Sequence, residues 1–486
     1  MIKLASLLLI LAGSVAGTVC PALPITQGAG SWPATATNLT TIDKGTNCTI
    51  KFNIPNNYVI LFRFSSDFQS TDDVVTIYDN NGQPKYTLVH QGKVAYNNIL
   101  YMPATTAQVQ VVSASGNTRF YLSYQYISLA NYVQVKKNTG DYFQLSAINP
   151  NQYFTFTSAN DNVIITYAIE IGSKTTDVRL SEYYVYDGDN INTAKMIGNL
   201  GEIGRGDVPG FHQSTGKSYT IVNFFGTRSS SYVIGNDAST IQGHSKYTVL
   251  WHSQGLNAQG NMTDLSDGGA LYTYICSDCS TYYWTSMRFD SLATISNKGY
   301  VTFQGQTPTH KKDKLIKYDP MTLTDSYFPQ MIPTGVITLN LYLSRISFNF
   351  NTINDGTVWK KAYEGRKGYI FSPNLWSTVA NSFNTEIRDD SQLYKFVVNM
   401  NKMNMGNVDS MTLKIGPTKG DPAVNNVYPR DKSSNGQVVS NGNYMTVGIT
   451  SSVTTDVRLS FEVQKASATT VAGLLVSVIF AAFYTL

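Results

Sequence analysis

The chain has 486 residues, a formal net charge of +4 and only 14% charged residues. A charge this small and this evenly spread excludes nucleic-acid binding, which needs a clustered basic face. The 32 Tyr and 22 Phe, set among many turn-forming residues, indicate half-buried strands joined by polar turns. The length is too great for one hydrophobic core and suits several domains of ordinary size.

Both ends of the chain are apolar and predict an exported, surface-tethered protein. Residues 1–17 combine Lys3, an apolar core and small residues, as a secretory signal peptide does. Residues 466–486 form a hydrophobic tail that no Lys or Arg follows. The apolar run is short for a membrane span of about 20 residues, which favours a GPI-type signal over a single-pass anchor, the alternative. The candidate lipid-attachment residues are Ala466, Ser467 and Ala468.

The four cysteines fit the oxidising secretory pathway. We expect disulfides between Cys20 and Cys48 and between Cys276 and Cys279, although the sequence alone leaves the connectivity open. Strand-like Tyr and Trp residues flank the second pair, which favours a structural disulfide over redox chemistry. A zinc site with His244 and His252 is the alternative.

Three Asn-X-Thr sequons predict N-linked glycans on surface loops, at Asn38, Asn47 and Asn261. Five aromatic residues surround the second cysteine pair, and they either stack on sugar rings or fill the core between strands. These residues are Tyr272, Tyr274, Tyr282, Tyr283 and Trp284.

The period-two pattern predicts strands along most of the chain. Apolar residues alternate with polar ones over 120–126 and again over 457–463. The alternation slips by one near Ser344, which predicts a bulge or a turn there. The one helical pattern is Leu375–Ile387, with Ser372-Pro373 as its cap and first turn.

A diffuse repeat organises these strands. A short strand that follows an acidic residue and carries Tyr78 recurs with Tyr186, and Asp409–Gly416 repeats it more weakly. The identical heptapeptides Thr175–Ser181 and Thr454–Ser460 fall at different phases of the repeat, so we interpret their identity as coincidence.

The Tyr-Val-Tyr-Asp-Gly-Asp turn at 184–189 and the leading Cys20 and Cys48 resemble the CUB domain, most closely the divergent CUB-like family expanded in nematodes. The resemblance implies an all-β fold of tandem antiparallel β-sandwich (CUB-like jelly-roll) domains, two of them and up to four. The expected segments are a signal peptide at 1–17, CUB-like domains at 18–128 and 131–240, a β-rich region of uncertain fold at 241–357, a CUB-like unit at 358–465 and the tail at 466–486.

CUB domains hold calcium with three carboxylates, and the chain departs from that pattern. Asp73 and Glu182 match the carboxylate just before the Tyr-Asp-Gly strand. The late turns at 113–116 and 225–227 have no carboxylate, whereas Ca²⁺ takes six or more oxygen ligands. We therefore expect no cofactor and no metal.

The sequence predicts no catalytic residues. The five His residues are scattered, and the adjacent Asp389 and Asp390 are typical of a solvated surface. The basic loop 310–314 is either solvated or a contact for an anionic surface. A cryptic secreted hydrolase within residues 241–400, with His244 or His252 as its functional residue, is an alternative.

The resemblance implies a non-catalytic extracellular recognition or barrier protein in innate defence, with glycans or microbial and cell-surface proteins as partners. A second alternative is a cell-adhesion ligand, because Arg205-Gly206-Asp207 is flanked by Gly and Pro that would hold it on a turn.

Overall fold

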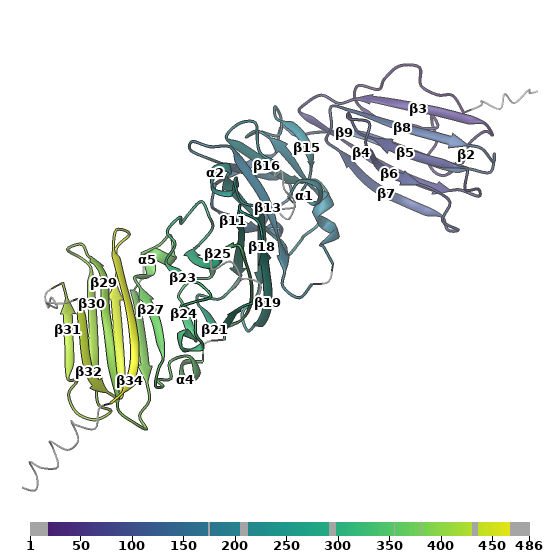
Figure 1. Cartoon of the computed structure of the whole chain (residues 1–486). Helices are drawn as coiled ribbons and strands as arrows, with labels where there is room; N and C mark the ends of the chain where they lie inside the picture. Colours follow the sequence, from purple (N-terminus) through teal and green to yellow (C-terminus); the bar gives the residue numbers. More distant parts are fainter. Residues whose placement is uncertain are drawn as a thin grey trace, which may run out of the picture.

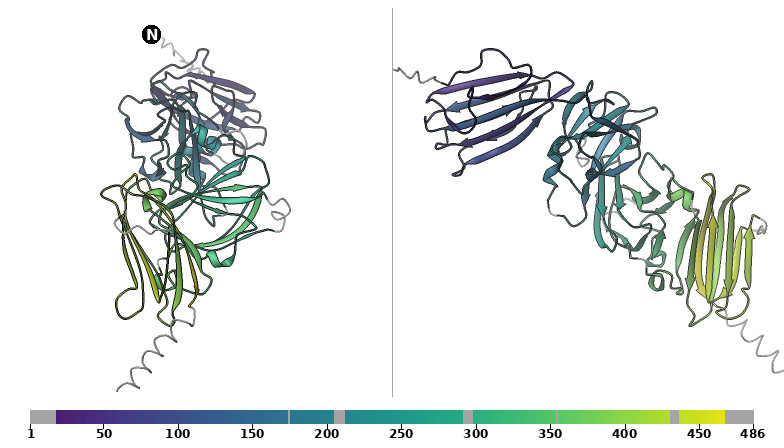
Figure 2. Two further views of the ribbon diagram at one scale, coloured as in Figure 1. Left: turned by 60° about the vertical axis from the view of Figure 1, so that its left-hand side comes forward. Right: turned by 180° about the vertical axis from the view of Figure 1, so that it is seen from behind.

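The computed structural model describes residues 18–173, 175–204, 212–290, 298–353, 355–380, 382–429 and 436–466. The chain folds mainly into antiparallel sheets, which pair into sandwich-like units strung along an elongated molecule (Figures 1 and 2). The predicted all-β fold class is therefore confirmed. The signal peptide, the Arg-Gly-Asp motif and almost all of the tail lie outside the described residues.

Unit 1 is a sandwich of two sheets, ordered β3-β8-β5-β6 and β1-β9-β4-β7, with β2 paired to β9. The predicted alternation holds in β9, where Phe120 and Leu122 are fully buried. The strands are β1 (Ala29–Trp32), β2 (Thr40–Thr41), β3 (Thr46–Asn53), β4 (Tyr58–Asp67), β5 (Val74–Tyr78), β6 (Pro84–Leu88), β7 (Ala95–Met102), β8 (Thr106–Ser113) and β9 (Arg119–Ser128).

Unit 2 has sheets β10-β12-β16-β14-β15 and β11-β17-β13. Its strands are β10 (Val133–Asn138), β11 (Tyr142–Gln144), β12 (Gln152–Thr157), β13 (Val163–Glu170), β14 (Tyr183–Asp187), β15 (Lys195–Asn199), β16 (Ser218–Asn223) and β17 (Tyr232–Asp237). Its short helices are η1 (Leu145–Ala147), η2 (Val178–Glu182), α1 (Leu200–Ile203) and α2 (Ala238–Ile241).

Unit 3 has sheets β18-β20-β25-β22-β23 and β19-β26-β21-β24. Its strands are β18 (Lys246–His252), β19 (Asn257–Asp264), β20 (Ala270–Cys276), β21 (Tyr282–Phe289), β22 (Tyr300–Gly305), β23 (Ile316–Tyr318), β24 (Gln330–Ile332), β25 (Val336–Tyr342) and β26 (Ser344–Asn351), with the one-turn helix η3 (Asp325–Tyr327).

Unit 4 has sheets β28-β33-β30-β31 and β27-β34-β29-β32. Its strands are β27 (Lys367–Phe371), β28 (Ser382–Arg388), β29 (Tyr394–Asn404), β30 (Ser410–Gly416), β31 (Val424–Tyr428), β32 (Gln437–Gly442), β33 (Tyr444–Thr450) and β34 (Asp456–Lys465), preceded or interrupted by α4 (Gly356–Trp359) and α5 (Pro373–Trp376).

All four units share one topology. When the strands of each unit are matched in chain order, the first sheet has the same strand order in every unit. The sheet β3-β8-β5-β6 of unit 1 corresponds to β12-β16-β14-β15, β20-β25-β22-β23 and β28-β33-β30-β31, and the second sheets correspond in the same way. A parallel pairing leads the first sheet each time: a bridge from Ile25 in unit 1, β10 in unit 2, β18 in unit 3 and a bridge from Lys361 in unit 4. In the described part of unit 2, the counterpart of β7 is reduced to one bridge at Gln213. The region that had no recognisable fold in the sequence thus repeats its neighbours.

Consecutive units pack tightly. An aromatic cluster between units 1 and 2 includes Tyr184, Tyr186 and Phe224. Units 2 and 3 share one eight-stranded sheet, because Ala168–Glu170 of β13 pairs in parallel with β18. Between units 3 and 4, the ring of Tyr369 stacks on that of Tyr327 at 5.8 Å.

The predicted helix over 375–387 is wrong. The helix α5 begins after Ser372, with Pro373 at its first position as expected, but it lasts one turn. Residues 382–388 instead form β28 and pair with β33. The slip near Ser344 is a turn, as predicted, since Leu343 between β25 and β26 has a φ of +44°.

Candidate functional site

The carboxylate of Asp73, just before β5 in unit 1, fixes the late turn that follows β8. Asp73 is fully buried at the start of β5, beside the end of β8. Its Oδ1 accepts hydrogen bonds from the backbone N–H groups of Ala114 (2.8 Å) and Ser115 (3.0 Å). Its Oδ2 accepts from the Ser115 hydroxyl at 2.6 Å. Burial raises the pKa of Asp73, and the hydrogen bonds from Ser115 and Ala114 outweigh it, so the pKa lies below its ordinary value.

The same device recurs in units 2 and 4. Glu182, just before β14, accepts a hydrogen bond from the Thr227 hydroxyl in the turn that follows β16. Asp409, just before β30, accepts from the backbone N–H of Ser452, which follows β33, at 2.8 Å. A second N–H, from Gly406, donates to the other oxygen of Asp409 at 2.6 Å.

Unit 3 replaces the carboxylate with a glycine. Gly299 precedes β22, and a Cβ there would lie 2.2 Å from the Ser344 hydroxyl and 2.7 Å from the Leu343 carbonyl oxygen. The late turn therefore packs directly on the backbone in unit 3. In the other three units an acidic side chain fills that space.

These carboxylates are engaged with the protein itself, which leaves few oxygens for a cation. Within the described ranges, no group of three or more His, Cys, Asp or Glu side chains could hold a metal ion. The hydrogen bonds to Asp73 and Asp409 tie each late turn to the start of the neighbouring strand.

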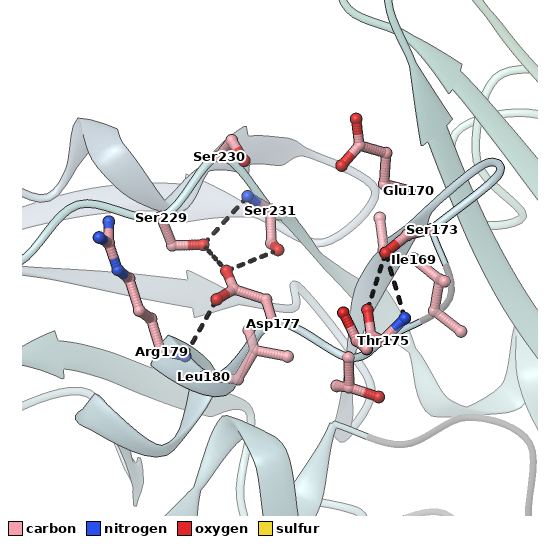
Figure 3. Close-up of a pocket in the computed structure, with 12 residues that line it drawn as sticks. Ile169, Glu170, Ser173, Thr175, Asp177, Arg179, Leu180, Ser229, Ser230 and Ser231 are labelled. Carbon is pink, nitrogen blue, oxygen red and sulfur yellow. Dashed lines mark hydrogen bonds between the residues drawn. The ribbon is translucent and has the colours of Figure 1, made fainter.

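A polar pocket opens on unit 2 and is a candidate for ligand binding (Figure 3). The pocket has a volume of about 280 Å³. The end of β13, the loop that leads into η2 and the segment before β17 form its walls. Glu170, Thr175 and Ser230 are exposed along its rim. Carboxylate and hydroxyl oxygens of this kind suit a polar, hydroxyl-rich ligand.

Asp177 lies at the centre of the pocket, between two serine hydroxyls (Figure 3). Its Oδ2 accepts from Ser229 (2.5 Å) and Ser231 (3.0 Å), and its Oδ1 accepts from the Arg179 N–H (3.0 Å). Burial raises the pKa of Asp177, and these hydrogen bonds together with the Arg179 charge outweigh it and lower the pKa. Asp177 is thus an ionised acceptor that joins two loops.

Both expected disulfides are present. Cys20 pairs with Cys48, and Cys276 pairs with Cys279 in the turn between two strands. The five aromatic residues around the second pair are each no more than 6% exposed. Four of them fill the core of unit 3, and the ring of Tyr283 stacks on that of Trp359, so the alternative of exposed, sugar-stacking aromatics is wrong.

His252 and the paired aspartates have structural partners. His252 is 3% exposed, with its ring nitrogens 3.0 Å from the Tyr282 hydroxyl and 2.9 Å from the Ser253 carbonyl oxygen. Burial lowers the pKa of His252. Asp389 accepts from Ser391, and Asp390 forms an ion pair with a neighbouring arginine. Neither arrangement assembles a nucleophile with a base.

The basic loop 310–314 begins in a junction that the sequence did not reveal. Thr307, just before it, donates to the Gly140 carbonyl of unit 2 at 2.8 Å. Thr309 donates to Asn236, and the His310 Nε2 lies 3.4 Å from an oxygen of Asp141. The loop therefore fastens unit 3 to unit 2, while Lys312 and Lys314 remain exposed.

The three sequon asparagines are exposed, but only Asn38 lies in a loop. Asn47 lies in β3 and Asn261 in β19, so the predicted loop positions of these two are wrong. Of the lipid-attachment candidates only Ala466 is described, directly after β34. No helix in the described ranges has the length and apolarity that crossing a membrane requires.

Residues 14–130 match the profile of the CUB-like domain, so unit 1 is a CUB-like domain. The chain is similar at 10% identity to the CUB1-EGF-CUB2 domain of human MASP-1/3, over 44% of this chain and 100% of that chain, with a TM-score of 0.18. It is also similar to the CUB1-EGF-CUB2 domains of rat MASP-1 (10% identity, 68% and 99%, TM-score 0.19) and to a chain of the Sulfolobus turreted icosahedral virus (9% identity, 93% and 100%, TM-score 0.17). Similarities this low carry no argument about function. Comparison with curated proteins finds no match.

The family match supports an extracellular, non-catalytic domain in unit 1. It ends at residue 130, so the CUB-like nature of units 2 to 4 and the limits of the four domains stay predictions. The shared strand order supports them.

Proposed function

We propose that the protein is a non-catalytic extracellular recognition or barrier protein that serves innate defence against microbes. In this proposal, the C-terminal tail tethers the chain to the cell surface through a GPI-type or single-pass anchor. The four units then form a stalk that carries the CUB-like unit 1 at its far end.

The recurring use of acidic side chains to hold turns supports this proposal best. Asp73, Asp177 and Asp409 each accept several hydrogen bonds from their own unit. A catalytic carboxylate needs access to a substrate and a pKa suited to proton transfer, whereas these carboxylates are engaged and acidified. We assign ligand contact to the polar pocket on unit 2, and the ligands to glycans or microbial and cell-surface proteins.

The test is binding of the purified, glycosylated chain from Thr18 to Lys465 to intact bacteria and to an array of glycans, with and without a calcium chelator. We expect binding that the chelator leaves unchanged and that Ser230→Trp, which fills the pocket, abolishes. Ser253→Trp, at an exposed position of unit 3, serves as the matched control. Absence of binding to every target, or binding that both variants leave intact, would contradict a recognition role through this pocket.

A further inference from the structure

The outer face of the second sheet of unit 3 is hollowed around a sequon. Strands β19, β26 and β21 lie side by side there, and Asn261 stands on the first of them. The groove encloses about 790 Å³, within the range of small-molecule sites. Its lining is polar apart from Phe348, whose ring packs beneath Gly260.

The strand register orders the polar side chains into two rows. Asn261 pairs with Ser347, and Ser347 pairs with Arg288 on the next strand. The second row, one step along each strand pair, holds Gln259, Asn349 and Ser286. Phe348 and Met287, between the rows, point inward and are buried, so both rows lie on the outer face of the sheet.

Small side chains in the middle of the rows make the hollow. The Ser347 side chain is short, and Arg288 stands two strand spacings, about 10 Å, from Asn261. The Arg288 side chain is 74% exposed and forms a 3.5 Å ion pair with Asp325, and it is long enough to turn toward the groove. Amide, hydroxyl and guanidinium groups together supply the donors and acceptors that sugar hydroxyls and acetamido groups require.

We propose that Asn261 carries an N-linked glycan whose first sugars lie in this groove, across Ser347 and toward Arg288. The occupant is thus an oligosaccharide of the chain itself, attached at the edge of the site that holds it. This inference rests on the proposed extracellular function, since the glycan is added in the secretory pathway. It also closes this face of unit 3 to other partners.

The test uses full-length protein recovered from the surface or the medium of eukaryotic cells, with glycopeptide mass spectrometry after timed, native digestion by a peptide N-glycosidase. Asn47, on an exposed strand of the same molecule, is the internal control. Two hydrogen bonds to the groove would make the docked glycan about ten times as populated as the undocked glycan. We therefore expect the glycosidase to release the glycan at Asn261 about tenfold more slowly than the glycan at Asn47. Denaturation should remove the difference.

Ser347→Trp, which fills the groove, and Arg288→Ala, which changes only an exposed side chain, should both raise the rate at Asn261 to that at Asn47. Lys312→Ala, outside the groove, should leave it slow. An unmodified Asn261 beside a modified Asn47, equal release rates in the wild type, or no response to both variants would overturn the inference alone. An exported chain with no glycan at any sequon would overturn it, and a chain that reaches neither the cell surface nor the medium would overturn the proposed function as well.

Discussion

Removing the buried carboxylate of unit 1 tests whether hydrogen bonds replace a metal at the late turn. Asp73→Ala deletes three accepted hydrogen bonds, two of them from backbone N–H groups. Bonds to a charged group contribute about 1.5–3 kcal/mol each, and the partly exposed donors recover some of that from water. We expect unit 1 to lose about 3 kcal/mol of its free energy of unfolding, which is roughly a hundredfold in the folded-to-unfolded ratio.

Hydrogen exchange measured by mass spectrometry on peptides from β5 and β8 isolates unit 1, since one unfolding midpoint for four units would not describe a two-state transition. Exchange in these peptides should be about a hundredfold faster in Asp73→Ala, and within about twofold of wild type in the exposed neighbour Asp72→Ala. Asp73→Asn keeps one acceptor oxygen and should lie between them. Calcium and chelator should change nothing. Equal exchange in Asp73→Ala and wild type, or stabilisation of the wild type by calcium, would refute the reasoning.

The pH dependence of the same hydrogen exchange tests independently whether Asp73 is ionised in the folded state. The folded pKa of Asp73 lies below its unfolded value of about 3.9, so the ionised carboxylate stabilises the folded state. Its contribution is complete above about pH 4 and is lost as the pH falls through the folded pKa. The difference between wild type and Asp73→Ala should therefore shrink below about pH 4. A difference that grows on acidification would contradict the assigned ionisation.

Three further changes address the junctions between units. Tyr184→Phe removes the 2.6 Å hydrogen bond to the Tyr101 carbonyl and should cost about 1 kcal/mol, seen as faster exchange in the aromatic cluster between units 1 and 2. Arg366→Lys should cost about 2–4 kcal/mol and loosen unit 4 in limited proteolysis, because the buried guanidinium donates to three carbonyl groups around the linker and an ammonium cannot span them. Gly140→Ala should lower the melting temperature and shift the His310 imidazole signals in NMR spectra, since a Cβ at this positive φ would lie 2.5 Å from the His310 ring. Gly172→Ala is the control for backbone strain, because Gly172 also has a positive φ but faces open space.

The sequence predicted the strands well wherever one face of a sheet is buried, because the period of two then shows in single residues such as Phe120 and Leu459. The recurrence of units 1, 2 and 4 was detectable through the acidic residue before a strand. Unit 3 was missed for a physical reason. Gly299 takes the place of that acidic residue, so the late turn packs in a different way and the motif disappears while the strand order persists.

The candidate site was harder to predict because it depends on loops that meet only in the folded unit. Asp177 approaches Ser229 and Ser231 across more than fifty positions of the chain, and no local spacing marks them. The groove around Asn261 depends on the register of three strands. The failed helix over 375–387 has a similar origin, because pairing of β28 with β33 decides that segment and local pattern does not.

The two copies of the heptapeptide show that tertiary contacts, and not the local sequence alone, determine secondary structure in this molecule. In Thr175–Ser181 the chain enters the 3₁₀ helix η2, exposing Val178 (84%) and burying Leu180 (1%). In Thr454–Ser460 the same letters enter β34, and the equivalent Val457 and Leu459 are both fully buried. Neighbouring strands on both sides of β34 set its register, whereas η2 has no strand beside it to pair with.

The shared sheet decides where the array can bend. Bending between units 2 and 3 would break the parallel pairing of β13 with β18 and pull Thr307 from Gly140, so these two units move as one body. Units 1 and 2 meet instead through side chains, with Tyr184 and Tyr186 of the turn motif buried against unit 1. Since side-chain contacts yield before a paired sheet does, small-angle scattering of Tyr184→Phe should show a shorter maximum dimension than the wild type. An unchanged dimension would mean that the aromatic cluster holds unit 1 rigidly without that hydrogen bond.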